Sequence, residues 1–154
     1  MRLILCVFTL LALSGVGFAD PIRHGALELN GAFAFSTPPT ARAAGGYVTI
    51  HNTGERADRL IGAETAFART EIHTTEVDDK GVARMIHQKD GLEVPAGGTL
   101  TLEPGGYHVM FMGLDAPFEE GKARAVTLIF EEAGPIDVSF DVVPRSARGG
   151  HKSH

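Results

Sequence analysis

Beyond residue 19 the chain contains three methionines, and each lies near a histidine in the sequence. The segments are EIHTTE around His73, ARMIHQ around Met85, and YHVMFM, which holds His108, Met110 and Met112. Residues two apart in a β-strand point to the same face, so we expect His108 and Met110 to lie side by side. Met85 and His73, carried by neighbouring strands or loops, would complete a set of four ligands.

The chemistry of such a set follows from the softness of its donors. A thioether is a good ligand for Cu(I) and a poor one for zinc, calcium or magnesium, whereas imidazole suits copper in either oxidation state. The only cysteine is Cys6, so the rest of the chain cannot form a thiolate zinc site, a cysteine nucleophile or a blue-copper centre. We therefore predict a Cu(I) site, and list its ligands as His73, Met85, His108 and Met110.

Simpler interpretations exist for the neighbouring residues. Methionine often fills gaps in a core, and for Met112 packing is as good an interpretation as metal binding. His87, two residues after Met85, is either an accessory ligand or a solvent-facing side chain. His24 and His51 have no soft ligand nearby in the sequence, so we expect them to be structural.

The last nine residues, SARGGHKSH from 146 to 154, are polar and contain two glycines. This composition predicts a flexible tail. Its His151 and His154 could supply nitrogen ligands to a second site, for Cu(II). A plain soluble tail is the alternative interpretation.

Residues 1–19 have the organisation of a secretory signal peptide. Arg2 precedes an apolar run, and Gly17-Phe18-Ala19 resembles a cleavage site. We expect an exported protein that begins at Asp20. No cysteine follows the small residues, so the pattern does not predict a lipid anchor, and no apolar run reaches the ~20 residues of a membrane span.

The remainder reads as one all-β domain over residues 20–145. Apolar and polar residues alternate in the segments 46–51, 98–103, 107–112, 123–130 and 136–142, with turn residues between them. Such short, regularly spaced strands are typical of a sandwich or barrel. The chain has 14 basic and 19 acidic side chains and a net charge of −5, which argues against nucleic acid as a partner.

The spacing of these residues resembles that of the periplasmic PCu(A)C copper chaperone family. The family pattern is a histidine, ten residues, a methionine, about 21 residues, and His-x-Met. Here ten residues follow the His73-Thr74 pair before Met85, and 22 residues separate Met85 from His108-Val109-Met110. The segments YVTIHNTGERADRLIGAET and GLEVPAGGTLTLEPGGYHVMFMGL also look like the family. Two details differ: Thr74 stands where the family often has Met, and the second gap is one residue longer.

The resemblance implies a cupredoxin-like Greek-key β-sandwich with an exposed Cu(I) site. It also implies a periplasmic role in delivering copper to the binuclear centre of cytochrome c oxidase. The partner would be an oxidase subunit or another copper-assembly protein. Some members carry a His-rich tail that takes Cu(II), which would suit His151 and His154.

Two other classes of function compete with a copper carrier. An oxygenase with an N-terminal histidine brace is disfavoured because the mature chain would begin at Asp20. A hydrolase is disfavoured because no serine of the mature chain lies in a nucleophile motif, so we expect no enzyme. The remaining alternative is a secreted β-sandwich that binds another protein and no metal.

Overall fold

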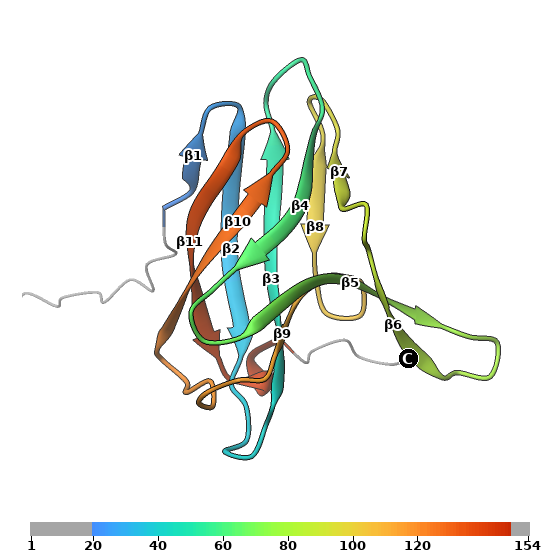
Figure 1. Cartoon of the computed structure of the whole chain (residues 1–154), viewed down its shortest axis with the longest axis vertical. Helices are drawn as coiled ribbons and strands as arrows, with labels where there is room; N and C mark the ends of the chain where they lie inside the picture. The colour runs from blue at the N-terminus through green and yellow to red at the C-terminus, as the bar shows by residue number, and fades with distance from the viewer. Residues whose placement is uncertain (1–19, 149–154) are drawn as a thin grey trace, which may run out of the picture.

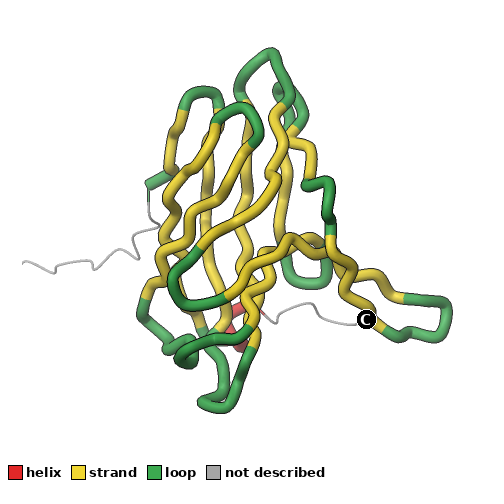
Figure 2. The backbone as a smooth tube through the Cα atoms, in the orientation of Figure 1, coloured by secondary structure: helices red, strands yellow, loops and turns green. Residues whose placement is uncertain are grey.

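The computed structural model describes residues 20–148, which form eleven strands and one short 3-10 helix (Figures 1 and 2). The strands are β1 Ile22–His24, β2 Leu27–Phe35, β3 Ala43–Asn52, β4 Asp58–Glu64, β5 Arg69–Val77, β6 Ala83–His87, β7 Leu92–Val94, β8 Thr99–Leu102, β9 Tyr107–Met112, β10 Ala123–Phe130 and β11 Gly134–Val143. The helix, η1, spans Arg145–Arg148. The predicted signal peptide lies outside the described residues. Of the predicted flexible tail, residues 146–148 belong to η1 and the others lie outside.

All the described strands join one hydrogen-bonded sheet that folds over on itself (Figure 1). Its order is β6-β5-β9-β3-β2-β11-β10-β4-β7, with β1 added to β2 and β8 added to β3. Most neighbours are antiparallel, but β2 and β11 run parallel. The register of β2 against β3 shifts between Asn30 and Phe33, and such a bulge bends a strand. The all-β prediction is confirmed.

The core lies between the folded halves and is built from the alternating positions of the strands. On β11 the side chains of Ile136, Val138, Phe140 and Val142 are buried and the residues between them are exposed or half-buried. This is the period-two pattern that the sequence predicts for 136–142. On β9 the core side chains are Val109 and Phe111, so the other face of that strand carries His108, Met110 and Met112.

The β5–β6 hairpin projects from the body as a two-stranded arm (Figure 1). Strand β5 pairs with β9 only as far as Thr74, and beyond that residue it pairs with β6 alone. The turn at the tip is held by the Asp78 carboxylate, which accepts hydrogen bonds from the backbone N–H groups of Lys80 and Val82. Arg84 lies 3.6 Å from the same carboxylate. The arm therefore has internal order although the body does not cover it.

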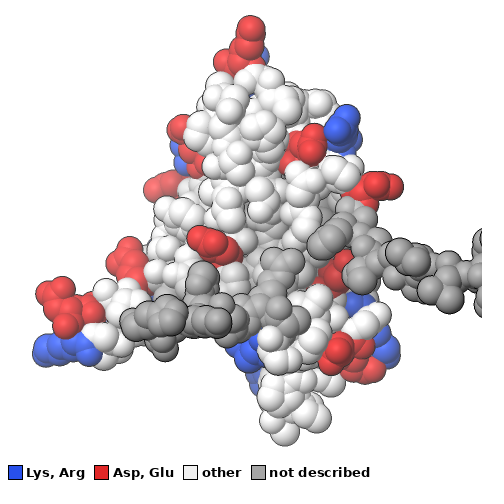
Figure 3. Space-filling model, turned by 180° about the vertical axis from the view of Figure 1, so that it is seen from behind, with Lys and Arg blue, Asp and Glu red and all other residues white. Residues whose placement is uncertain are grey.

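Charged side chains of both signs are interspersed on the face drawn in Figure 3. The arm also carries both signs, since Asp78 and Arg84 form an ion pair there. Within residues 20–148 we find no helix of the length and apolarity that crossing a membrane requires.

Close packing beneath β3 leads to a stability prediction at Gly46. A Cβ there would lie 2.7 Å from the Phe111 ring and 3.0 Å from the Phe140 ring, and both rings are fully buried. Gly46→Ala should therefore destabilise the fold by about 1–3 kcal/mol, the usual cost of overpacking. Urea unfolding measures this.

The matched control is Gly62→Ala on β4, where an added Cβ meets nothing within 4 Å. Both positions are in strands and neither has a positive φ, so their intrinsic backbone effects should be similar. Equal unfolding free energies for the two variants would contradict the proposed packing.

Candidate metal centre

Three histidines from adjacent strands lie in one row across the sheet. His73 on β5 pairs directly with His87 on β6 and with His108 on β9. The ring centroids are 5.5 Å apart for His73 and His87, and 5.9 Å apart for His73 and His108. Because Ile72 and Val109 point into the core, this row occupies the opposite face of the sheet.

His108 is the most enclosed member of the row, with 3% of its surface exposed. The ring of Tyr47 lies beside it, with centroids 6.4 Å apart. Burial lowers the pKa of His108, a hydrogen bond to the Gly106 carbonyl opposes that change, and the charge of His73 adds to it. Burial also raises the pKa of Tyr47. Both groups are therefore favoured in their neutral forms.

His73 is held by the carboxylate of Glu71, two residues earlier on the same face of β5. The distance from His73 Nε2 to Glu71 Oε2 is 2.8 Å. That carboxylate also forms an ion pair with Arg69 at 2.7 Å and lies 3.7 Å from His87 Nδ1. The hydrogen bond from His73 is the main cause of a lowered pKa at Glu71, so Glu71 is an anion beside the histidine row.

These contacts fix the tautomers of the two central histidines. A carbonyl and a carboxylate can only accept, so His108 carries its proton on Nδ1 and His73 carries its proton on Nε2. In each neutral ring the other nitrogen then has a free lone pair. Those two atoms, His108 Nε2 and His73 Nδ1, are the only buried side-chain N or O atoms without a partner among the described residues.

Buried polar atoms without a partner are rare, and each calls for an explanation. Metal-binding histidines have this arrangement: one ring nitrogen is held by a carboxylate or carbonyl and the other is free for the metal. A metal–imidazole bond is about 2 Å long. Rings with centroids 5.9 Å apart are therefore close enough for both to bind one ion.

The two predicted thioether ligands flank this pair along the strands. Met110 follows His108 by two residues, is half-buried, and pairs with Glu71 on one side and with Gly45 on the other. Met85 precedes His87 by two residues on β6, pairs with Thr75, and is 58% exposed. The structure therefore brings all four predicted residues onto one face, with Met85 at its exposed edge on the arm.

The other residues considered from the sequence fall elsewhere or have other partners. Met112 pairs with Arg69, whose Nη2 lies 3.4 Å from the sulfur. His51 Nδ1 lies 2.9 Å from the Thr99 hydroxyl, and His24 is exposed on β1 at the other end of the sheet. His151 and His154 lie outside the described residues.

Within residues 20–148 no group of three or more His, Cys, Asp or Glu side chains is arranged to hold a metal ion. A complete coordination sphere at the histidine row would therefore need donors of another type. The thioethers of Met85 and Met110 lie on this face beside the row, whereas the sulfur of Met112 contacts Arg69. Thioether donors favour a soft ion over zinc or calcium.

Sequence reasoning overlooked Glu71 and Tyr47, and left His87 as either an accessory ligand or a solvent-facing side chain. Glu71 could have been found, because a residue two before His73 on a strand shares its face. Tyr47 could not, because its approach to His108 depends on the pairing of β3 with β9.

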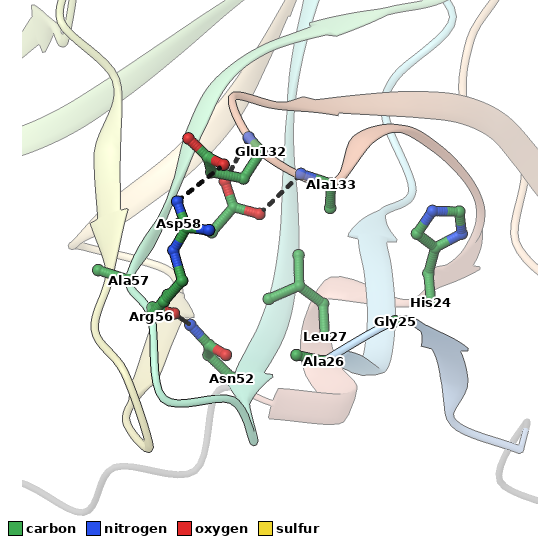
Figure 4. A pocket seen from close by; sticks show the side chains of 10 residues that line it. All are labelled: His24, Gly25, Ala26, Leu27, Asn52, Arg56, Ala57, Asp58, Glu132 and Ala133. Carbon is green, nitrogen blue, oxygen red and sulfur yellow. Dashed lines mark hydrogen bonds and ion pairs between the residues drawn. The ribbon is translucent and has the colours of Figure 1, made fainter.

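A separate hollow of about 300 Å³ lies beside the turn between β1 and β2 and is also lined by residues of the β3–β4 and β10–β11 turns (Figure 4). Its buried polar groups already have partners. The Asp58 carboxylate accepts hydrogen bonds from the backbone N–H groups of Glu132 and Ala133, and the Asn52 amide donates to the Arg56 and Val94 carbonyls. The Asp58 and Asn52 side chains therefore serve to hold the neighbouring turns in place.

The lowered pKa of His108 predicts that the metal-free fold loses stability in acid. A histidine in the unfolded chain takes up a proton below about pH 6.5, whereas His108 in the folded protein does so only at lower pH. The unfolded state therefore binds more protons between these two values. Stability falls as the pH drops through that window, by up to about 1.4 kcal/mol per pH unit.

Urea unfolding of the wild type and of His108→Gln at pH 7.5 and pH 5.0 tests this expectation. Other groups also titrate over this range, so the informative quantity is the difference between the two proteins. The variant should lose less stability on acidification. Equal losses would contradict the assignment of this titration to His108.

The chain is similar in sequence to known proteins over most of its described length. Residues 27–142 match the LpqE-like family, described as "Putative lipoprotein LpqE-like". Over 94 residues, 60% of this chain, it is 39% identical to "Putative lipoprotein Lxx21020" of Leifsonia xyli subsp. xyli. The matched region spans 56% of the length of that Leifsonia protein.

The fold is similar to solved structures of PCuAC domains. The copper-bound PCuAC domain from PmoF2 has a TM-score of 0.68 and 24% identity, covering 81% of this chain and 98% of that domain. The solution structure of Cu(I)-bound DR1885 from Deinococcus radiodurans has a TM-score of 0.60 and 31% identity, covering 82% and 83%. These likenesses confirm the predicted cupredoxin-like β-sandwich and the resemblance to PCu(A)C domains.

Proposed function

The chain belongs to the LpqE-like family, and from this premise we propose that it is a copper carrier that binds one Cu(I) ion at the histidine row. The ligands would be His73, Met85, His108 and Met110. One observation carries the proposal: His73 and His108, which pair directly across β5 and β9, each have a buried ring nitrogen without a partner, and a thioether lies on either side of them along the strands. The copper bound by the similar PmoF2 domain and the Cu(I) bound by DR1885 support the same choice of metal.

The graded exposure of these residues suits a carrier better than a permanent metal site. His108 is 3% exposed and Met85 is 58% exposed, so one side of the ion would be enclosed and the other accessible. A recipient could displace Met85 first and then the remaining ligands one at a time. The copper would then pass between proteins without being released as a free ion.

We also propose that the protein acts in the periplasm, after export by its N-terminal signal peptide. The resemblance to PCu(A)C chaperones supports the binuclear copper centre of cytochrome c oxidase as the recipient. The mature domain would span residues 20–145. In the remaining tail, His151 and His154 would form a second site for Cu(II).

The test is an anaerobic competition for Cu(I) between the mature protein and a chromogenic chelator. We expect one tightly bound Cu(I) per chain, and transfer of that copper to a metal-free soluble fragment that carries the oxidase centre. Failure to withdraw any Cu(I) from the chelator would overturn the proposal and leave a metal-free protein-interaction domain. Binding without transfer to the fragment would overturn only the choice of recipient.

A further inference from the structure

Glu71 is the charged residue most closely associated with the histidine row, although neither the spacing of the soft ligands nor the proposed ligand set includes it. Its side chain is 22% exposed, so it is neither a free surface group nor a buried one. Each of its oxygens has a separate role. Oε1 accepts from Arg69 at 2.7 Å, and Oε2 lies 2.8 Å from His73 Nε2.

We propose that Glu71 is a positioning residue that makes His73 bind copper through Nδ1 and adjusts the preference of the site between Cu(I) and Cu(II). The inference rests on the proposed copper-binding function and deepens it. Glu71 itself is not a ligand in this proposal, because His73 Nε2–H occupies the oxygen that faces the row.

The first step of the argument concerns orientation. An isolated imidazole can present either nitrogen to a metal, and its ring can turn about χ2. At His73 the carboxylate accepts a hydrogen bond from Nε2–H, so the lone pair is confined to Nδ1, which is the buried nitrogen without a partner. His108 has the opposite arrangement: its Nδ1–H donates a hydrogen bond to the Gly106 carbonyl, and its Nε2 has no partner. The two rings are thus fixed by two different acceptors.

The second step concerns Arg69, which holds the carboxylate itself. One guanidinium nitrogen donates to Glu71 Oε1, and the other lies 3.4 Å from the Met112 sulfur. Arg69 therefore restrains Glu71 and at the same time contacts the one thioether of β9 that is not in the proposed ligand set. We therefore assign Met112 to the residues that support Arg69 and Glu71, and not to the metal ligands.

The third step concerns charge. The four proposed ligands are neutral, and the Glu71 carboxylate is an anion in direct contact with one of them, His73. A negative charge stabilises a dication more than a monocation. A carboxylate that accepts a hydrogen bond from a ligating imidazole also makes that imidazole a stronger ligand. Both effects support Cu(II) more than Cu(I), so Glu71 should lower the reduction potential of the bound copper.

The experiment compares Glu71→Ala and Glu71→Gln with the wild type. Removing a residue that holds a metal-binding histidine costs about 10–100-fold in affinity, so Glu71→Ala should lose this much for Cu(I). Glu71→Gln keeps an oxygen that can accept from His73 but removes the charge. It should lose less Cu(I) affinity, lose more for Cu(II) than for Cu(I), and show a higher reduction potential.

A second measurement needs no copper. Nitrogen-15 NMR of the imidazoles in the metal-free wild type should show the Nε2–H form for His73 and the Nδ1–H form for His108. In Glu71→Ala the His73 ring should become a mixture of both forms while His108 is unchanged. The matched control is Glu119→Gln, which removes a carboxylate that pairs with Lys122 at a distance of 2.7 Å. Both residues lie between β9 and β10 and outside the histidine row, so this variant should alter none of these values.

The outcomes separate this inference from the function on which it rests. Failure of the wild type to bind Cu(I) would overturn both. Tight binding by the wild type, with equal affinities, equal potentials and an unchanged His73 tautomer in the Glu71 variants, would overturn the role of Glu71 alone.

Discussion

His108→Leu is expected to lower the affinity for Cu(I) by at least about 100-fold, because it removes a ligand rather than a residue that supports one. His108 is the enclosed member of the row, its Nε2 has no partner, and its ring centroid lies 5.9 Å from that of His73. Leucine fills the buried space but cannot bind a metal. Competition against a Cu(I) chelator, with the unfolding free energy measured in parallel, separates lost binding from lost folding.

The control for this variant is His51→Leu. His51 also lies in a strand, six residues along β3 from the Gly45 that pairs with Met110, and its imidazole is held by the Thr99 hydroxyl. Its replacement should leave the Cu(I) affinity within about twofold of the wild-type value, a much smaller change than the loss of a residue that supports a ligand would cause. An unchanged affinity in His108→Leu, with the fold intact, would exclude this residue as a ligand.

The strands that the sequence predicted are those in which one face is buried and the other is not. Segments 123–130 and 136–142 correspond to β10 and β11 because the core selects alternate residues there. The alternation around His108 is also correct: Val109 and Phe111 enter the core and His108 does not. The extra residue between Met85 and His108 therefore leaves the face assignment of β9 intact.

The projecting arm could not be predicted in the same way. The five residues of β6 are all exposed, so no buried face imposes a period-two pattern on them. Likewise, the sequence placed His73 and Met85 near the site by their residue types and by a spacing that resembles a known family. Their adjacency depends on the order β6-β5-β9 in the sheet, which long-range pairing determines and local pattern does not.

The partners of the histidines were beyond sequence reasoning for a similar reason. The carbonyl of Gly106 and the ring of Tyr47 reach His108 through the path of the chain before β9 and through the pairing of β3. A sequence motif of ligand residues identifies the side chains that would bind the ion. It does not identify the hydrogen-bond acceptors that determine which ring nitrogen of each histidine is free to bind the ion.

The double variant Met85→Leu/Met110→Leu is expected to abolish the preference for Cu(I). Leucine is close to methionine in volume, so packing changes little, but both sulfur donors are lost while both imidazoles remain. Because thioethers favour Cu(I) and imidazole binds both oxidation states, Cu(I) affinity should fall by about 100-fold or more. Cu(II) affinity should change by less than about tenfold, and competition assays in each oxidation state measure the two values.

The two single variants should differ, because the methionines differ in exposure. Met110 is half-buried between Glu71 and Gly45, whereas Met85 is 58% exposed on the arm. Met110→Leu should account for most of the lost affinity. Met85→Leu should chiefly alter the rate of transfer to a second chelator, since it removes the ligand that a recipient meets first. Equal Cu(I) affinities for the double variant and the wild type would show that the sulfurs only pack against the sheet, and the proposed site would then lack the donors that distinguish Cu(I) from other ions.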